Sequence, residues 1–238
     1  MVDTKSPWYP YPLVQEAYIH LEGVENMPKK ICDYLLDAPK AMYQPPDNNQ
    51  YPRCRLWKYL FYDGSQPLGN TLPTIQEKMS VLFDPENPTT PPTEKGYRLF
   101  PIVWSKQAQE TAQTRINVFL GRMVPSSENF KVAYSVVFDI FTHYTYETNT
   151  KTDAYSRALA IEQCLVEALN GVCLDGIGTF FMSRTKHPDC GSRVFYDGQQ
   201  NVGRELTLAF EIATNAQRDL PDNITMPSFS KDGSIRMV

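Results

Sequence analysis

The fold is decided by residues 130–146, which read FKVAYSVVFDIFTHYTY. On one side of this stretch the side chains are almost all apolar or aromatic: Val132, Tyr134, Val136, Phe138, Ile140, Tyr144 and Tyr146. Successive side chains of a strand point to opposite faces, so a period of two predicts one long strand with a buried face.

A second stretch, residues 204–212, repeats the pattern as RELTLAFEI, with Leu206, Leu208, Phe210 and Ile212 inward and Glu205, Thr207 and Glu211 outward. Between the two strands the sequence predicts an amphipathic helix over residues 153–170. Thr152 or Asp153 would cap it and Asn170-Gly171 would close it. Its apolar stripe consists of Tyr155, Ala158, Leu159, Leu165, Val166 and Leu169. Two strands and a helix of this kind predict a sheet buried under the helix.

Shorter elements extend this arrangement on both sides. A helix is expected over Met27–Leu36, and a short one within residues 72–83 that Thr74 would cap. Pro101 confines the strand predicted at residues 97–104 to a sheet edge, or breaks it. Strands are expected at residues 53–62, 97–104, 114–120, 176–182 and 193–196. The predicted class is α+β, a mostly antiparallel sheet with helices packed on one face and extended N- and C-terminal arms.

The same patterns predict the organisation of the chain. Residues 1–26 form an N-terminal arm, in which Trp8 and Tyr11 stand among prolines that disfavour a helix. Residues 27–215 form a single α+β domain with a loop-rich insertion at about 43–96, and residues 216–238 a C-terminal extension.

Composition narrows the class of protein. The chain has 238 residues, 42% hydrophobic, with a formal net charge of −4. A weakly acidic chain is not a typical general nucleic-acid binder, which needs basic side chains to replace phosphate counterions. No segment is apolar over the length that crosses a bilayer, and the N-terminus does not resemble a secretion signal. The five cysteines are scattered and odd in number, which favours reduced thiols.

A search for chemistry predicts no catalytic residue, no cofactor and no metal. A catalytic Cys–His pair would need Cys190 beside His143 or His187. A metal set of Cys164, Cys173, His187 and Cys190 does not have the spacing of a zinc site. Buried cysteines and a surface histidine explain these residues more simply.

The order of these elements resembles the tail terminator and head–tail joining (neck) proteins of tailed bacteriophages. The resemblance covers residues 110–215 and rests on strands at Arg115–Leu120 and Phe130–Tyr146, the helix at Asp153–Asn170, and the closing strand GRELTLAFEI at 203–212. The chain departs from that family by its arm, its 43–96 insertion and its C-terminal extension. Because of these additions, the resemblance does not decide whether the chain is a terminator, a neck or collar protein, or another tail component.

The resemblance implies a structural virion protein that forms a ring, commonly a hexamer, and joins the tail tube to the head connector. It would be assembled in the host cytoplasm, contact other neck and tail proteins, and let DNA pass through its lumen without sequence-specific binding or membrane contact. We expect Trp8, Tyr11, Phe141 and His143 to make contacts between subunits.

Two alternatives stand beside this interpretation. The first is a small α+β enzyme or ligand-binding domain that uses the loop from His187 to Cys190. The second is a module with a basic rim that faces DNA, since residues such as Arg115 and Arg122 flank predicted strand ends.

Overall fold

The computed structural model describes residues 24–36, 47–64, 66–85, 96–102, 113–125, 131–147, 156–174, 178–197, 201–213, 227–229 and 235–237. Its centre is a seven-stranded sheet in the order β1-β2-β3-β7-β5-β4, in which β6 also pairs with β7. The strands are β1 (Leu99–Phe100), β2 (Arg115–Pro125), β3 (Lys131–His143), β4 (Cys173–Leu174), β5 (Gly178–Phe181), β6 (Gly191–Asp197) and β7 (Asn201–Ala213). All pairs are antiparallel except β1 with β2. The predicted α+β class is therefore confirmed.

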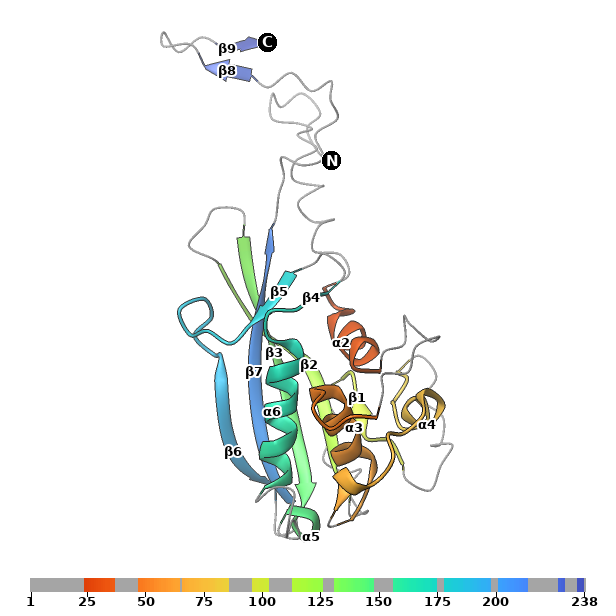
Figure 1. Ribbon diagram of the computed structural model, residues 1–238. Coiled ribbons are helices and arrows are strands. Elements are labelled where there is room, and N and C mark those ends of the chain that lie inside the picture. Colours follow the sequence, from red (N-terminus) through yellow and green to blue (C-terminus); the bar gives the residue numbers. More distant parts are fainter. Residues whose placement is uncertain are drawn as a thin grey trace.

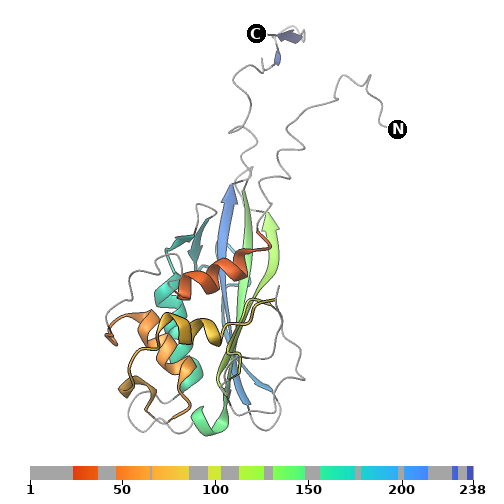
Figure 2. The ribbon, with the colours of Figure 1, turned by 90° about the vertical axis from the view of Figure 1, so that its right-hand side faces the viewer.

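The larger helices gather on one side of this sheet, as Figures 1 and 2 show. They are α2 (Met27–Leu36), α3 (Pro52–Phe61), α4 (Ile75–Ser80) and α6 (Arg157–Leu169). Two single turns, η2 (Pro67–Gly69) and α5 (Tyr144–Glu147), complete the helical content of the described residues. Helix α6 packs against β3 and β7, and α2 packs against β2. We call the side of the sheet beneath these helices the helix face.

The core lies between α6 and the two long strands. Phe138 and Val136 of β3 pair in register with Leu206 and Leu208 of β7, and all four are fully buried. Above them lie Ile161, Leu165 and Leu169 of α6, also fully buried. Each such side chain contributes roughly 1.5–3 kcal/mol when it leaves water, so this layer stabilises the fold strongly. The alternation read from residues 130–146 and 204–212 is thus confirmed where it predicts the core.

The end of the long strand differs from the prediction. Strand β3 ends at His143, and Tyr144 begins the turn α5. Tyr144 is 53% exposed and does not continue the buried face. The predicted strand is too long because Tyr144 and Tyr146 continue the alternation of apolar residues in the sequence, although the backbone already forms the turn α5 there.

The strand expected at residues 53–62 is wrong, because this segment forms helix α3. Pro52 occupies its first turn, where an amide donor is not needed. Cys54, Trp57 and Leu60 recur at the helical spacing, and Trp57 donates from Nε1 to the Leu35 carbonyl oxygen at 2.7 Å. Most side chains of α3 are buried, so apolar residues occur on nearly all sides of the helix. The sequence then also fits the alternation of a strand.

The segment 43–96, predicted to be a loop-rich insertion, contains the helices α3 and α4 and the turn η2. Helix α3 supplies core residues, and the predicted short helix is present as α4, with a capping box between Thr74 and Glu77. Two fully buried arginines hold the end of α3. Arg98 donates to the Leu60 carbonyl oxygen at 2.9 Å and pairs with Asp63, while Arg157 donates to the Tyr62 carbonyl oxygen at 2.9 Å. Positive charge suits the carbonyl end of a helix.

Helix α6 begins later than expected. Its cap is Ser156, whose Oγ accepts from the Leu159 amide at 3.1 Å. The buried Glu147 carboxylate accepts from the Ala158 amide at 3.0 Å. Thr152 and Asp153, the predicted caps, lie outside the described residues. The predicted stop at Asn170-Gly171 is confirmed, with Gly171 at a φ of +84°.

The remaining strands occur where the sequence predicts them, but their lengths differ from the predicted ones. The strand expected at 97–104 is reduced to β1, which lies at a sheet edge as Pro101 required. The strand expected at 114–120 extends to Pro125. The C-terminal extension contains β8 (Pro227–Phe229) and β9 (Ile235–Met237), which pair with each other in a separate sheet.

Candidate functional site

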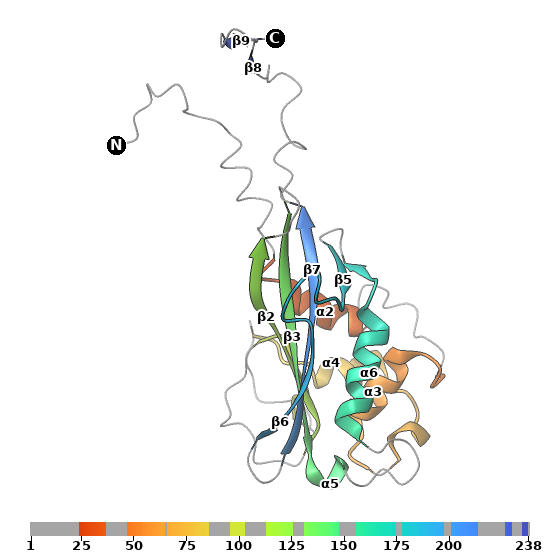
Figure 3. The same ribbon diagram turned by 90° about the vertical axis from the view of Figure 1, so that its left-hand side faces the viewer.

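The side of the sheet opposite the helices carries the candidate site. No helix among the described residues packs there, and we call this side the open face. In Figure 3 it is the left-hand side of the sheet, away from α3 and α6. In register, one row across β2, β3, β7 and β6 reads Phe119, Val137, Thr207 and Gly191. The next row reads Asn117, Asp139, Glu205 and Arg193.

A bulge in β2 shapes the upper part of this face. Leu120 pairs with Val136 and Met123 with Tyr134, so β2 contains one more residue than β3 between these pairs. The Arg122 carbonyl oxygen accepts hydrogen bonds from Ser135 Oγ and from His187 Nε2, each at 3.1 Å. His187 Nδ1 accepts from the Asp189 amide at 3.3 Å, so these contacts assign the ring proton to Nε2. The fully buried His187 thereby ties the loop between β5 and β6 to β2.

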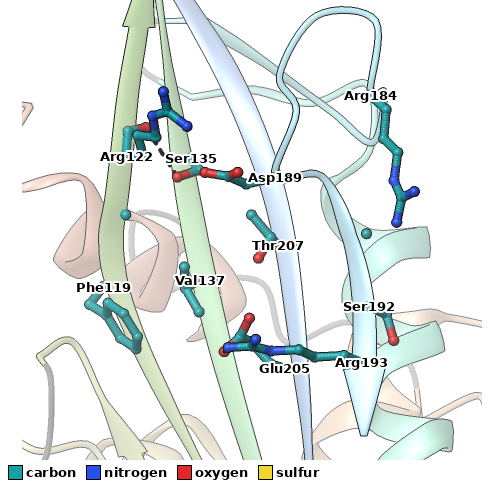
Figure 4. A pocket seen from close by; sticks show the side chains of 12 residues that line it. Phe119, Arg122, Ser135, Val137, Arg184, Asp189, Ser192, Arg193, Glu205 and Thr207 are labelled. Atoms are coloured by element: carbon teal, nitrogen blue, oxygen red, sulfur yellow. Dashed lines mark hydrogen bonds and ion pairs between the residues drawn. The ribbon is translucent and has the colours of Figure 1, made fainter.

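A pocket of about 470 Å³ lies between this bulge, the loop and β6. Its floor contains the nearly buried Ser135 and Thr207, and Phe119 and Val137 lie toward β2 (Figure 4). The pocket exists because small residues face it. At Gly121 an added Cβ would lie 2.5 Å from Ser135 Oγ, so a larger residue there would displace that hydroxyl.

Guanidinium groups border the pocket on different sides. Arg122 extends from β2 and Arg184 from the loop between β5 and β6, as Figure 4 shows. Arg184 Nε donates to the Cys190 carbonyl oxygen at 3.1 Å. Gly191 has a φ of +151°, and a Cβ there would come within 3.2 Å of an Arg184 terminal nitrogen. The absence of a side chain at Gly191 therefore allows Arg184 to lie against the strand.

The lower border of the pocket is a charged row. Arg193 pairs with Glu205 at 2.6 Å, and Glu205 stands opposite Asp139 in the sheet. Burial, together with the charge of Glu205, raises the pKa of Asp139 to about 6, although Arg193 and Arg115 act in the other direction. The row thus combines an exposed ion pair with one carboxyl group that titrates near neutrality.

The residues predicted to contact other subunits are placed as follows. Phe141 lies on the open face but is only 8% exposed, because the Phe195 ring packs on it at 5.1 Å and the Arg115 guanidinium lies 4.4 Å from its centroid. Little of Phe141 is therefore left to contact another chain. His143, at the end of β3, is partly exposed and lies beside Tyr144. Trp8 and Tyr11 lie outside the described residues.

The loop from His187 to Cys190 does not form a reactive pair. Both ring nitrogens of His187 are engaged with backbone groups, and burial raises the pKa of the Cys190 thiol. Cys164 is buried in α6, whereas Cys173 is exposed in β4. Within the part of the chain that the structure describes, no three His, Cys, Asp or Glu side chains converge as metal ligands.

Sequence reasoning missed the pocket itself. The sequence pattern marks Arg122 only as a basic residue near a predicted strand end and Thr207 only as an outward-facing residue, and it gives no reason to select Arg184, Ser135 or Gly191. One signal is present: Gly121 interrupts a strand pattern, which commonly marks a bulge. The position of Arg184 beside Gly191 of β6 depends on the path of a loop that no local pattern predicts.

Comparison with known proteins adds one finding. The model of the YomW family matches residues 54–210, about two thirds of the chain, and the family carries a phage-derived name of the Bacillus prophage type. The match spans α3, the long strands, α6 and most of the open face. No curated protein matches the chain.

Proposed function

The chain belongs to the YomW family, and from this premise we propose that it is a structural virion protein without enzymatic activity. It forms a ring at the head–tail junction or at the end of the tail, as a terminator or neck protein does, and joins the tail tube to the head connector. Its place is in the virion. Its partners are other copies of itself and other neck and tail proteins, and it makes no contact with a membrane.

The observation that carries this proposal is the one-sided sheet. Strands β3 and β7 pair along thirteen residues each, with helices on one face only among the described residues. The open face is ordered by the bulge, the Phe141–Phe195 contact and the Arg193–Glu205 pair rather than by a covering layer. A rigid slab of this kind suits a subunit that presents one face to its neighbours or to the lumen.

Two further features support the proposal. The phage-derived family name agrees with a virion component. The order of strands and helix over residues 110–215 resembles terminator and neck proteins, and the structure has strands β2, β3 and β7 and helix α6 there, with ends that differ from those predicted.

The helices among the described residues are each too short or too polar to span a lipid bilayer.

The enzyme alternative has less support. It required His187 and Cys190 to act together, but His187 is fully buried and holds two backbone groups through its ring. Cys190 is likewise buried, and its thiol faces the Phe181 carbonyl oxygen at 3.8 Å. A histidine in this arrangement positions a loop and is not available to activate a nucleophile.

Inactivation of the gene in an inducible phage tests the proposal. We expect a stop codon early in the gene to leave DNA-filled heads and unattached or overlong tails in electron micrographs, and a plasmid copy to restore joined particles. Intact, infective particles from the mutant phage would contradict the proposal.

A further inference from the structure

We propose that the pocket between Arg122 and Arg184 on the open face is a docking site for an acidic segment of another protein chain, in which each guanidinium group binds a separate carboxylate of that segment. This inference goes beyond the proposed function, because it concerns one face of a single chain and holds whether or not the chain forms rings.

The two arginines are available for such a contact. Neither guanidinium forms an ion pair with a described residue, whereas Arg193, the third arginine of the pocket, is paired with Glu205. Arg184 uses only its Nε, toward the Cys190 carbonyl oxygen. Guanidinium groups bind carboxylates through paired charge-assisted hydrogen bonds, which are stronger than neutral ones.

The rest of the pocket favours a peptide over a nucleic-acid backbone. The carboxylates of Asp189 and Glu205 also line it. They would repel a run of phosphates, but they can accept hydrogen bonds from the amide groups of a peptide. The chain as a whole has a formal net charge of −4, which is unfavourable for a polyanion.

The apolar side of the pocket fits the same occupant. Phe119 and Val137, both partly exposed, lie beside the nearly buried hydroxyl residues Ser135 and Thr207. An extended peptide that crosses the strands can place aliphatic carbon on Phe119 and one acidic side chain at each arginine. A volume of about 470 Å³ accommodates several residues of such a segment and far exceeds a single inorganic anion.

The geometry is held in advance of binding. His187 fixes the loop to the Arg122 carbonyl oxygen, and Gly191 leaves room for Arg184 against β6. A pre-organised site loses less conformational entropy when a partner binds.

The test uses the full chain and a fluorescently labelled octapeptide that carries two glutamates, four residues apart, among alanines; its binding is followed by fluorescence anisotropy at low salt. We expect the double variant Arg122→Gln/Arg184→Gln to bind at least about tenfold more weakly than the unchanged protein. Arg55→Gln is the control for the single variants Arg122→Gln and Arg184→Gln, because it too removes one positive charge, from an ion pair with Glu167 away from the pocket, and it should bind as the unchanged protein does.

The single variant Arg122→Gln distinguishes a loss of binding from a loss of folding. The structural role of Arg122 belongs to its carbonyl oxygen, which the substitution leaves in place, so its thermal unfolding should be unchanged while the affinity falls. Equal affinity of the double variant and the unchanged protein would overturn the proposal. So would displacement of the peptide by oligothymidylate or by inorganic phosphate at concentrations equal to that of unlabelled peptide, since either would assign the site to phosphate.

Discussion

At the scale of single residues, one backbone oxygen organises the open face. The Arg122 carbonyl accepts from Ser135 and from His187, and this is possible because the bulge gives β2 an extra residue at this point. His187 in turn accepts from the Asp189 amide. Three segments distant in the sequence, β2, β3 and the loop between β5 and β6, thus meet at one carbonyl oxygen. The hydrogen bond to this oxygen explains why a histidine in a polar loop is fully buried.

Replacement of His187 should therefore be costly. His187→Leu leaves the Asp189 amide without its acceptor and removes one donor from the Arg122 carbonyl oxygen, so we expect the free energy of unfolding to fall by about 2–3 kcal/mol. Denaturant unfolding measures it. His143→Leu is the control, since His143 is partly exposed, and it should cost less than about 1 kcal/mol. Equal losses for the two variants would contradict this role of His187.

Asp139 predicts a dependence of stability on pH. Its pKa is about 6 in the folded protein, above the value of about 3.9 for an unfolded aspartate. The folded state therefore binds the proton more tightly, and stability should fall as the pH rises from about 4 to 6, by about 1–2 kcal/mol after solvent screening.

Asp139→Asn isolates this contribution. We expect the variant to lose the decline between about pH 4 and 6 and to be more stable than the unchanged protein at pH 7.5. Chemical unfolding at a series of pH values measures both. A variant whose stability follows the same curve as the unchanged protein would show that Asp139 is not the responsible group.

At the scale of elements, the hairpin of β6 and β7 shows how a glycine positions an aromatic contact. Gly203 pairs with Phe195, and an added Cβ would lie 2.2 Å from that ring. The ring therefore lies over the Gly203 backbone and reaches Phe141 edge-on, with an interplanar angle of 76°. Burial of Phe141 depends on this arrangement.

Gly203→Ala should displace the Phe195 ring and expose Phe141. We expect a loss of about 1–3 kcal/mol in the free energy of unfolding from this overpacking. Gly69→Ala is the matched control, because nothing lies within 4 Å of the added Cβ, and it should change stability by less than about 0.5 kcal/mol. Denaturant unfolding measures both free energies. Equal values for the two variants would show that the close contact at Gly203 does not constrain the hairpin.

The elements also show what a sequence can and cannot predict. The two long strands were predictable because each has one strongly apolar face, as Val136 and Leu208 illustrate. Helix α3 was mistaken for a strand because it is buried on nearly all sides, so neither period dominates. The pocket was not predictable, since Arg122 and Arg184 border it only because of a bulge and a loop path that depend on tertiary contacts.

At the scale of the whole molecule, the chain is a slab with one covered and one open face. Helices α2 and α6 cover the sheet on one side, while the open face holds the pocket and the charged row. The family match spans most of this slab, from residue 54 to residue 210. We propose that this asymmetry serves a subunit whose neighbours bind the open face or the edges of the sheet.

Native mass spectrometry of the purified chain tests whether copies of it assemble into a closed ring, as we propose. We expect one dominant oligomer of fixed copy number, a hexamer if the resemblance to tail terminators holds, which negative-stain images show as a ring with an open centre. A protein that remains monomeric at every concentration up to the limit of solubility would contradict it.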